Sequence, residues 1–191
     1  MLEKTKKIIK RVAIFGDADL KSDDEAYIKA KETAKLLVES GYIIVNGGGP
    51  GIMGAATEGA KEADGVVELV VMDPEKEPDN YEGIDKENFA YASKVYYTDT
   101  YEHRLDKLME IADAYVIFKG GTGTLSEVGM VWEQAKFEYG NHEPLVFVGK
   151  EWREIVETLQ KNMNYQNIEK RVVATVETAD EVIKALKQVE N

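Results

Sequence analysis

The sequence predicts one α/β domain of Rossmann type, with a doubly wound, mostly parallel sheet and helices on both faces. Three observations predict it. Short apolar segments alternate with amphipathic helical segments along the chain, a pattern typical of parallel βαβ units. Segments such as Leu145–Val148 are wholly apolar, as strands are when both faces of a sheet are covered. Two glycine-rich stretches each lie between a predicted strand and a predicted helix, where such folds bind ligands.

Strands and helices alternate through the first half of the chain. Apolar residues at helical spacing predict a helix over 23–40, and Gly41 stands just past its end, where helices commonly stop. Pro50 suits the first turn of the next helix, while Pro74 and Pro78 mark residues 73–88 as a polar surface loop. The expected elements are strand 12–15, helix 23–40, strand 42–45, helix 50–63 and strand 66–72.

The second half continues the same alternation. Leu105, Leu108 and Ile111 lie on one face of a predicted helix. Thr178 caps the last helix, and Glu181 stands three residues further on, in the position of a capping box. The expected elements are strand 94–97, helix 100–112, strand 114–118, helix 124–139, strand 145–148, helix 151–161, strand 172–176 and helix 179–189.

Composition limits the classes of function that the chain can have. Its 191 residues suit one domain with a buried core, and no linker or repeat divides them, so we expect a single domain over residues 1–191. The net charge of −12 disfavours nucleic acid and anionic membranes as partners. The chain has no cysteine and only two histidines, which leaves little material for thiolate catalysis or a metal site. No apolar run has membrane-spanning length or resembles a signal peptide, so we expect a cytoplasmic protein.

The first glycine cluster follows the predicted strand 42–45 and opens a helix. Glycine permits positive φ and close backbone approach, and a helix start offers free N–H groups at the positive end of its dipole. The cluster therefore suits a phosphate or a ribose, although a tight turn with close helix–sheet packing is an alternative. Its candidate ligand-binding residues are Gly47, Gly48, Gly49, Gly51, Met53 and Gly54.

The second glycine cluster follows the predicted strand 114–118 and opens another helix. Its threonine hydroxyls add to the backbone donors, although a threonine here can also simply cap the helix. Two such turns in one small domain favour a phosphate site. The candidates are Gly120, Gly121, Thr122, Gly123 and Thr124. Neither cluster has the spacing of a Walker-type ATPase, and the first strand lacks the glycine spacing of a dinucleotide site.

Two charged residues adjoin the second cluster. Glu127 lies three residues after Thr124, so its carboxylate shares a helix face with the glycine turn. Arg104 begins the preceding helix and carries a guanidinium that pairs well with carboxylate or phosphate. A surface glutamate stabilised by the helix dipole and a solvated arginine are the alternatives. Tyr101 and Trp132 can line a base pocket or simply pack.

These motifs resemble the Lonely Guy (LOG) family, long labelled "lysine decarboxylase-like". The resemblance covers nearly the whole chain and rests on Gly-Gly-Gly-x-Gly-Ile-Met-Gly from Gly47 and Gly-Gly-x-Gly-Thr-x-x-Glu from Gly120. It implies a phosphoribohydrolase that cleaves the N-glycosidic bond of a nucleoside 5′-monophosphate and releases free base and ribose 5-phosphate. It further implies that Arg104 and Glu127 are the catalytic pair. Neither a metal nor a cofactor is needed for such a reaction.

The chain departs from the family pattern at three places. Lys119 stands where the family has proline, and Leu105 follows the arginine in place of lysine. The first strand ends in Gly16-Asp17-Ala18-Asp19, where the family commonly has Gly-Ser-Ser. Acidic residues repel phosphate but accept hydrogen bonds from ribose hydroxyls, so Gly16 and Asp17 are candidates for ribose or base contacts.

Other activities remain as alternatives. The same fold includes molybdenum-cofactor carriers and DNA-processing DprA relatives, so a non-catalytic nucleotide or molybdenum-cofactor binding protein is the runner-up. A lysine decarboxylase would need pyridoxal phosphate on an activated lysine, and only Lys119 adjoins a glycine turn. The resemblance also implies a homodimer whose face includes the Glu127 helix, with Met130, Val131 and Trp132 as interface residues or, alternatively, core residues.

Overall fold

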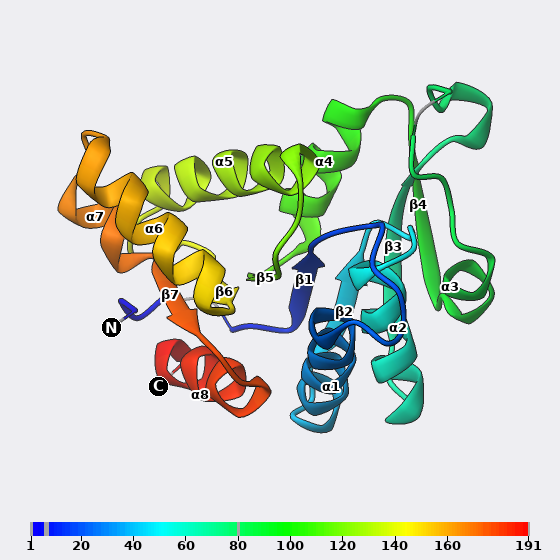
Figure 1. Ribbon diagram of the computed structural model, residues 1–191, viewed down its shortest axis with the longest axis horizontal. Coiled ribbons are helices and arrows are strands. Elements are labelled where there is room, and N and C mark those ends of the chain that lie inside the picture. The colour runs from blue at the N-terminus through cyan, green and yellow to red at the C-terminus, as the bar shows by residue number, and fades with distance from the viewer. Residues whose placement is uncertain (1, 6–7, 80, 191) are drawn as a thin grey trace.

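A parallel sheet forms the middle layer of the molecule (Figure 1). The computed structural model describes residues 2–5, 8–79 and 81–190. Within these residues seven strands pair in the order β4-β3-β2-β1-β5-β6-β7, and every pairing is parallel. The strands are β1 (Arg11–Phe15), β2 (Ile43–Asn46), β3 (Val67–Met72), β4 (Lys94–Thr98), β5 (Ala114–Ile117), β6 (Leu145–Val148) and β7 (Val173–Val176). The predicted α/β class is confirmed.

The direction in which the sheet grows reverses at β1. The chain first adds β2, β3 and β4 on one side of β1 and then returns to place β5 on the other side. Phe15 at the end of β1 pairs with Ile117 at the end of β5, so these two strands finish side by side. In an open parallel sheet the crevice at such a reversal is where ligands bind. The topology therefore locates the candidate site before any side chain is considered.

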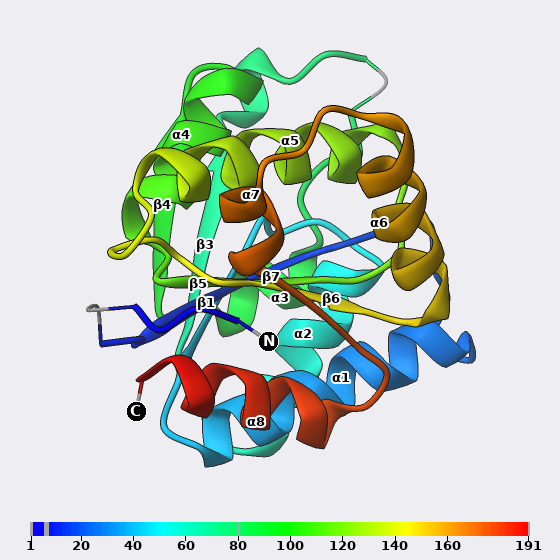
Figure 2. The same cartoon turned by 90° about the vertical axis from the view of Figure 1, so that its left-hand side faces the viewer.

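Helices cover both faces of the sheet, as Figure 2 shows with the sheet nearly edge-on. α1, α2 and α8 lie on one face, whereas α4, α5, α6 and α7 lie on the other. None of the helices in the described ranges is long and apolar enough to cross a membrane. The helices are α1 (Glu25–Glu39), α2 (Ile52–Glu62), α3 (Lys86–Tyr91), α4 (Tyr101–Ile111), α5 (Thr122–Phe137), α6 (Lys150–Asn162), α7 (Asn167–Arg171) and α8 (Ala179–Glu190).

The strands send alternate side chains into two hydrophobic cores. In β1, Val12 and Ile14 pack with the α1, α2 and α8 side, while Ala13 and Phe15 pack with the α4, α5 and α6 side. This follows from the two-residue period of a strand. Both faces of β1 are buried, which accounts for its apolar sequence. The central strands are thus fixed from both sides, and their carboxyl ends provide a rigid base for loops.

Three local expectations need correction. The segment 73–88 is not loop throughout, because it contains a 3₁₀ turn (Pro74–Lys76) and the start of α3. Asp85 caps α3 by accepting hydrogen bonds from the N–H groups of Glu87 and Asn88. The second glycine turn is shorter than expected, since α5 begins at Thr122. The short helix α7 was also missed, because five residues give too little periodicity to recognise.

The capping box at the start of α8 is confirmed. The N–H of Glu181 donates to Thr178 Oγ1 at 3.3 Å, and the N–H of Thr178 donates to Glu181 Oε2 at 3.2 Å. These reciprocal bonds satisfy backbone donors that the helix itself leaves free.

Candidate functional site

A cavity of about 220 Å³ lies at the carboxyl ends of β1 and β5. Both glycine clusters reach it, together with the start of α4 and the first turns of α5. Part of each glycine cluster therefore lies around one space with Arg104 and Glu127. The lining residues are Ile14, Phe15, Gly16, Asp17, Ala18, Asp19, Gly47, Met53, Glu82, Tyr101, Arg104, Gly121, Thr122, Gly123, Thr124 and Glu127.

The start of α5 forms the wall of the cavity best suited to an anion. Gly121 is the N-cap residue and makes no side-chain cap hydrogen bond. The first N–H groups of a helix have no acceptor within the helix, and they lie at the positive end of its dipole. Thr122 and Gly123 are exposed, whereas Thr124 is buried. This wall can therefore present several donors to one negatively charged group.

Gly120 brings the second turn close to the loop after β1. A Cβ atom on Gly120 would lie 2.2 Å from Thr124 Oγ1 and 3.1 Å from the backbone nitrogen of Asp17, so only glycine fits. The N–H of Asp17 donates to Lys119 O at 3.1 Å, and Asp17 O accepts from the N–H of Ile52 at 2.8 Å. The backbone of Asp17 thus connects the loops that follow β1, β2 and β5.

The Asp17 carboxylate accepts a hydrogen bond from the N–H of Asp19 at 3.0 Å. Both residues line the cavity beside Gly16. The structure therefore brings two acids into the same space as the start of α5. Their oxygens can accept hydrogen bonds from hydroxyl groups, and their charge disfavours a ligand with many negative charges.

The first glycine cluster contributes mainly through its first residue. Gly47 lines the cavity, whereas Gly48, Gly49, Gly51 and Gly54 are not among the lining residues. The carbonyl of Gly48 accepts from the N–H of Asp85 at 2.8 Å, and that of Gly49 accepts from Asn88 Nδ2 at 2.5 Å.

Gly51 has a φ of +62°, and a Cβ there would lie 2.2 Å from Asp17 O. Close packing thus accounts for most of the first cluster.

Arg104 lines the cavity and is itself only 3% exposed. Its Nε donates to Val70 O at 3.0 Å and its Nη2 donates to Gly47 O at 3.3 Å. The same Nη2 lies 3.3 Å from Glu82 Oε1, an ion pair at the cavity edge, and 3.7 Å from Met53 Sδ. Arg104 is therefore no solvated surface arginine, because backbone carbonyls within β3 and just after β2 fix its guanidinium.

Glu127 projects from the first turns of α5 into the cavity wall and is 9% exposed. Burial raises the pKa of its carboxyl to about 7, and this effect exceeds the lowering of the pKa by the Arg104 guanidinium. The carboxylate of Glu82 raises the pKa further. Arg104 thus opposes the effect of burial on the Glu127 pKa but does not cancel it. A carboxyl with a pKa near 7 can both accept and donate a proton at neutral pH.

Sequence reasoning missed Glu82 as a residue of the cavity. It lies in the segment 73–88, where many acids alternate with polar residues and no periodicity distinguishes one of them. Of the two aromatic candidates, Tyr101 lines the cavity, donates its hydroxyl to Gly123 O at 3.3 Å and lies 2.8 Å from Ser126 Oγ. Trp132 is a core residue, 5% exposed, whose Nε1 donates to Glu169 O.

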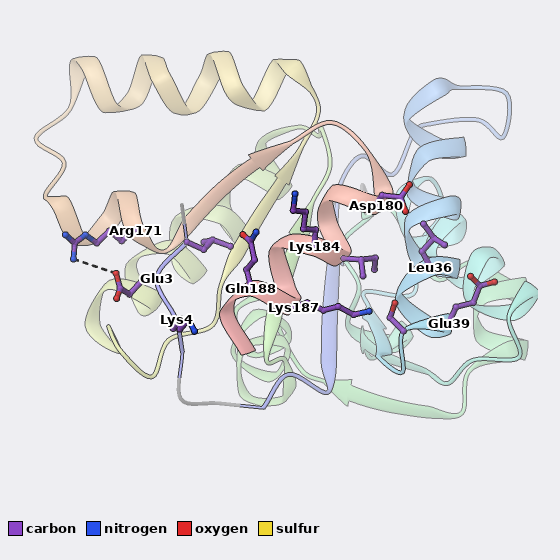
Figure 3. A pocket seen from close by; sticks show the side chains of 12 residues that line it. Glu3, Lys4, Leu36, Glu39, Arg171, Asp180, Lys184, Lys187 and Gln188 are labelled. Carbon is purple, nitrogen blue, oxygen red and sulfur yellow. Dashed lines mark ion pairs between the residues drawn. The ribbon is translucent and has the colours of Figure 1, made fainter. Parts of the chain in front are cut away.

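A larger hollow of about 1200 Å³ lies elsewhere, between the N-terminal segment, α1 and α8 (Figure 3). Lys184, Lys187 and Glu39 line it, and an ion pair of 3.7 Å between Arg171 and Glu3 lies at one side. Neither glycine turn contributes to this groove. Size alone does not make it the candidate site, since the donors and the buried titratable carboxyl gather at the smaller cavity.

No group of three or more His, Cys, Asp or Glu side chains is placed to hold a metal ion within residues 2–5, 8–79 and 81–190.

Comparison with known proteins places the chain among similar sequences and folds. A sequence model of the family described as "Possible lysine decarboxylase" matches residues 52–189. An uncharacterized protein of Archaeoglobus fulgidus is 28% identical over 155 residues, which cover 81% of this chain and 93% of that protein.

Solved structures share the fold at low identity. The molybdenum cofactor binding protein of the phototrophic bacterium Rippkaea orientalis superposes with a TM-score of 0.72 at 17% identity, covering 96% of this chain and 99% of that one. The Moco carrier protein of Chlamydomonas reinhardtii gives a TM-score of 0.66 at 21% identity, covering 95% and 98%. At these identities the similarity is one of fold alone.

Proposed function

The chain belongs to the family described as possible lysine decarboxylases, whose members are LOG-like, and from this premise we propose that it is a nucleoside 5′-monophosphate phosphoribohydrolase. The reaction is hydrolysis of the N-glycosidic bond, which releases the free base and ribose 5-phosphate. One observation carries the proposal. The buried carboxyl of Glu127 and the open start of α5 face the same cavity at the carboxyl ends of β1 and β5.

The start of α5 would bind the 5′-phosphate. The N–H groups of Thr122, Gly123 and Thr124 would donate to its oxygens, and the threonine hydroxyls add further donors. This contact is remote from the bond that breaks, so its binding energy serves to orient C1′ against Glu127. Because the acids Asp17 and Asp19 line the same cavity, one phosphate is favoured over a chain of phosphates.

Glu127 would act on the ribose. Cleavage of an N-glycosidic bond passes through an oxocarbenium-like ribose, which a nearby carboxylate stabilises. The same carboxylate can orient a water molecule and take its proton as the water oxygen bonds to C1′. The base leaves with the electron pair of the C1′–N bond and receives the proton that Glu127 took. A hydroxyl of the ribose can donate to Asp17. Arg104 would hold the backbone around the site in place through its hydrogen bonds to Val70 O and Gly47 O, and it would not contact the reacting atoms.

The family description also implies lysine decarboxylation, which requires pyridoxal phosphate linked to a lysine. The residues that line the cavity include no lysine. Lys119, the lysine next to the second glycine turn, is exposed and lies outside the lining. The cavity therefore does not fit that cofactor, and no step of the proposed reaction uses it.

A second candidate function is non-catalytic binding of a molybdenum cofactor. The fold likeness to the carrier proteins and the acidic loop at Asp17 and Asp19 favour it. In this case the start of α5 would bind the phosphate of the cofactor, and Glu127 would have no chemical role. The two candidates differ in whether free base appears.

We further propose that the protein is a cytoplasmic homodimer that uses α5 as its contact. Leu125, Met130 and Phe137 are 53%, 48% and 71% exposed on this helix, which supports an apolar contact face. For Val131 and Trp132, the alternative of a core position holds, since they are 1% and 5% exposed.

The experiment is incubation of the purified protein with a panel of nucleoside 5′-monophosphates, with free base measured by chromatography. We expect base release from at least one of them, and loss of release in Glu127→Gln, while phosphate still binds. Glu133→Gln is the matched control, because Glu133 lies on the same helix and pairs with Lys136 at 2.8 Å, away from the cavity. A folded wild-type protein that releases no base from any member of the panel would refute the hydrolase and favour the carrier.

A further inference from the structure

Glu82 enters the site from a segment that belongs to neither glycine motif. We infer that Glu82 is a positioning residue: its carboxylate engages the Arg104 guanidinium and keeps that cation from pairing with the Glu127 carboxyl. The consequence for catalysis rests on the proposed hydrolase. The arrangement of the three charges does not, since it follows from the contacts of these side chains.

Three oxygen atoms accept hydrogen bonds from the Arg104 guanidinium. Nε donates to Val70 O at 3.0 Å, and Nη2 is shared between Gly47 O at 3.3 Å and Glu82 Oε1 at 3.3 Å. Glu82 is therefore the carboxylate that forms an ion pair with Arg104 among the residues the structure describes. A buried guanidinium needs such a partner, because an unpaired charge in a low-dielectric interior is costly.

The segment that carries Glu82 is attached where it crosses the cavity. The N–H of Asp85 donates to Gly48 O at 2.8 Å, so the segment is joined to the first glycine turn. Gly83, the next residue, has a φ of +71°, a backbone conformation that favours glycine. The Tyr81 ring lies 5.7 Å from Arg104 Cζ, at cation–π distance. Two consecutive side chains of this segment thus contact one guanidinium.

Glu127 is the second carboxyl of the cavity with which the Arg104 guanidinium could form an ion pair. Both line the same cavity, and the other titratable groups that line it are Tyr101 from α4, Glu82 from the crossing segment, and Asp17 and Asp19 from the loop after β1. Arg104 lowers the pKa of Glu127 and Glu82 raises it.

If Glu82 lost its charge, the guanidinium would lack its ion-pair partner, and its attraction for ionised Glu127 would increase. A carboxylate held in an ion pair is a weaker base toward water. By holding the Arg104 guanidinium, Glu82 therefore keeps the Glu127 carboxylate free to accept a proton from water.

The test compares Glu82→Gln with wild type by carbon NMR of ¹³C-labelled glutamate side chains, with the Glu127 signal assigned by its absence in Glu127→Gln. We expect Glu127 to titrate about one pH unit lower in Glu82→Gln. Glu75→Gln is the matched control, because Glu75 is exposed on the same segment and does not line the cavity. Equal titration of Glu127 in Glu82→Gln, Glu75→Gln and wild type would overturn the inference.

The second readout is the pH dependence of kcat/KM for the best substrate, which reports the pKa values of the free enzyme, as the NMR titration does. In Glu82→Gln the acidic limb should move to lower pH by the amount seen in the NMR titration, whereas a purely structural defect would lower the plateau and leave the limb in place. An unmoved limb in an active Glu82→Gln enzyme would contradict the inference. If wild type hydrolyses no monophosphate, the proposed function fails, and the NMR titration alone decides the role of Glu82.

Discussion

Arg104 occupies the space that a side chain on Gly47 would need. A Cβ atom on Gly47 would lie 1.7 Å from Arg104 Nη2, far inside contact distance. The glycine that opens the first motif is thus required by a guanidinium that lies 57 positions further along the chain. The contact brings the first motif to the cavity that the second glycine turn also lines, although β5 separates α4 from that turn along the chain.

Substitution of Gly47 tests that relationship. In Gly47→Ala the guanidinium must leave its bonds to Gly47 O and Glu82, and we expect a loss of at least tenfold in kcat and a destabilisation of about 1–3 kcal/mol. Kinetics and urea unfolding measure the two effects. Gly129→Ala is the control, because a Cβ there meets nothing within 4 Å and the residue lies inside α5. Normal activity in Gly47→Ala would show that Arg104 can move without consequence.

The raised pKa of Glu127 predicts a pH-dependent gain in stability for Glu127→Gln. A carboxyl whose pKa rises from 4.5 to about 7 on folding binds more protons when folded between these values, so the wild-type free energy of unfolding falls as pH rises through that range. Relative to wild type, Glu127→Gln should gain about 2–3 kcal/mol between pH 5 and pH 8. Urea unfolding at both pH values measures it. Glu133→Gln should show no such pH-dependent gain, and a constant difference for Glu127→Gln would refute the shift.

The sequence alone predicted the sheet and both glycine turns, and it singled out Arg104 and Glu127, which line one cavity in the structure. These features depend on local patterns: alternation of apolar strands with helices, and glycines between a strand and a helix. The structure brings Gly47, Arg104 and Glu127 around one cavity because the strand order reverses at β1, which places the ends of separate βαβ units together.

Features that depend on long-range contacts were missed. Glu82 is one acid among several in a polar segment, and its place at the site depends on contacts with residues distant in the sequence, such as its ion pair with Arg104 and the bond between Asp85 and Gly48. Long-range contacts also explain why most glycines of the first motif do not line the cavity. The carbonyl of Gly49 is engaged by Asn88 of α3, a helix of six residues that is too short to show a helical period.

The exposed apolar residues of α5 predict a change of oligomeric state. Met130→Glu places a charge on the proposed contact face, so we expect a dimer of the wild type to become a monomer, as measured by light scattering after size exclusion. Ile28→Glu is the control, because Ile28 is 54% exposed and lies on α1. A monomeric wild type, or equal behaviour of the two variants, would contradict a contact through α5.

The anion-binding role of the α5 start predicts a specific effect on KM. Thr122 is exposed and lines the cavity, and its hydroxyl would donate to the 5′-phosphate. Thr122→Val removes that donor and keeps the branched shape. Loss of a hydrogen bond to a charged group costs about 1.5–3 kcal/mol, so KM should rise roughly tenfold or more while kcat changes little. Thr158→Val, an exposed position on α6 outside the cavity, should leave KM unchanged. A fall in kcat with KM unchanged would place Thr122 at the reacting atoms instead, because only groups that act in the transition state alter kcat alone.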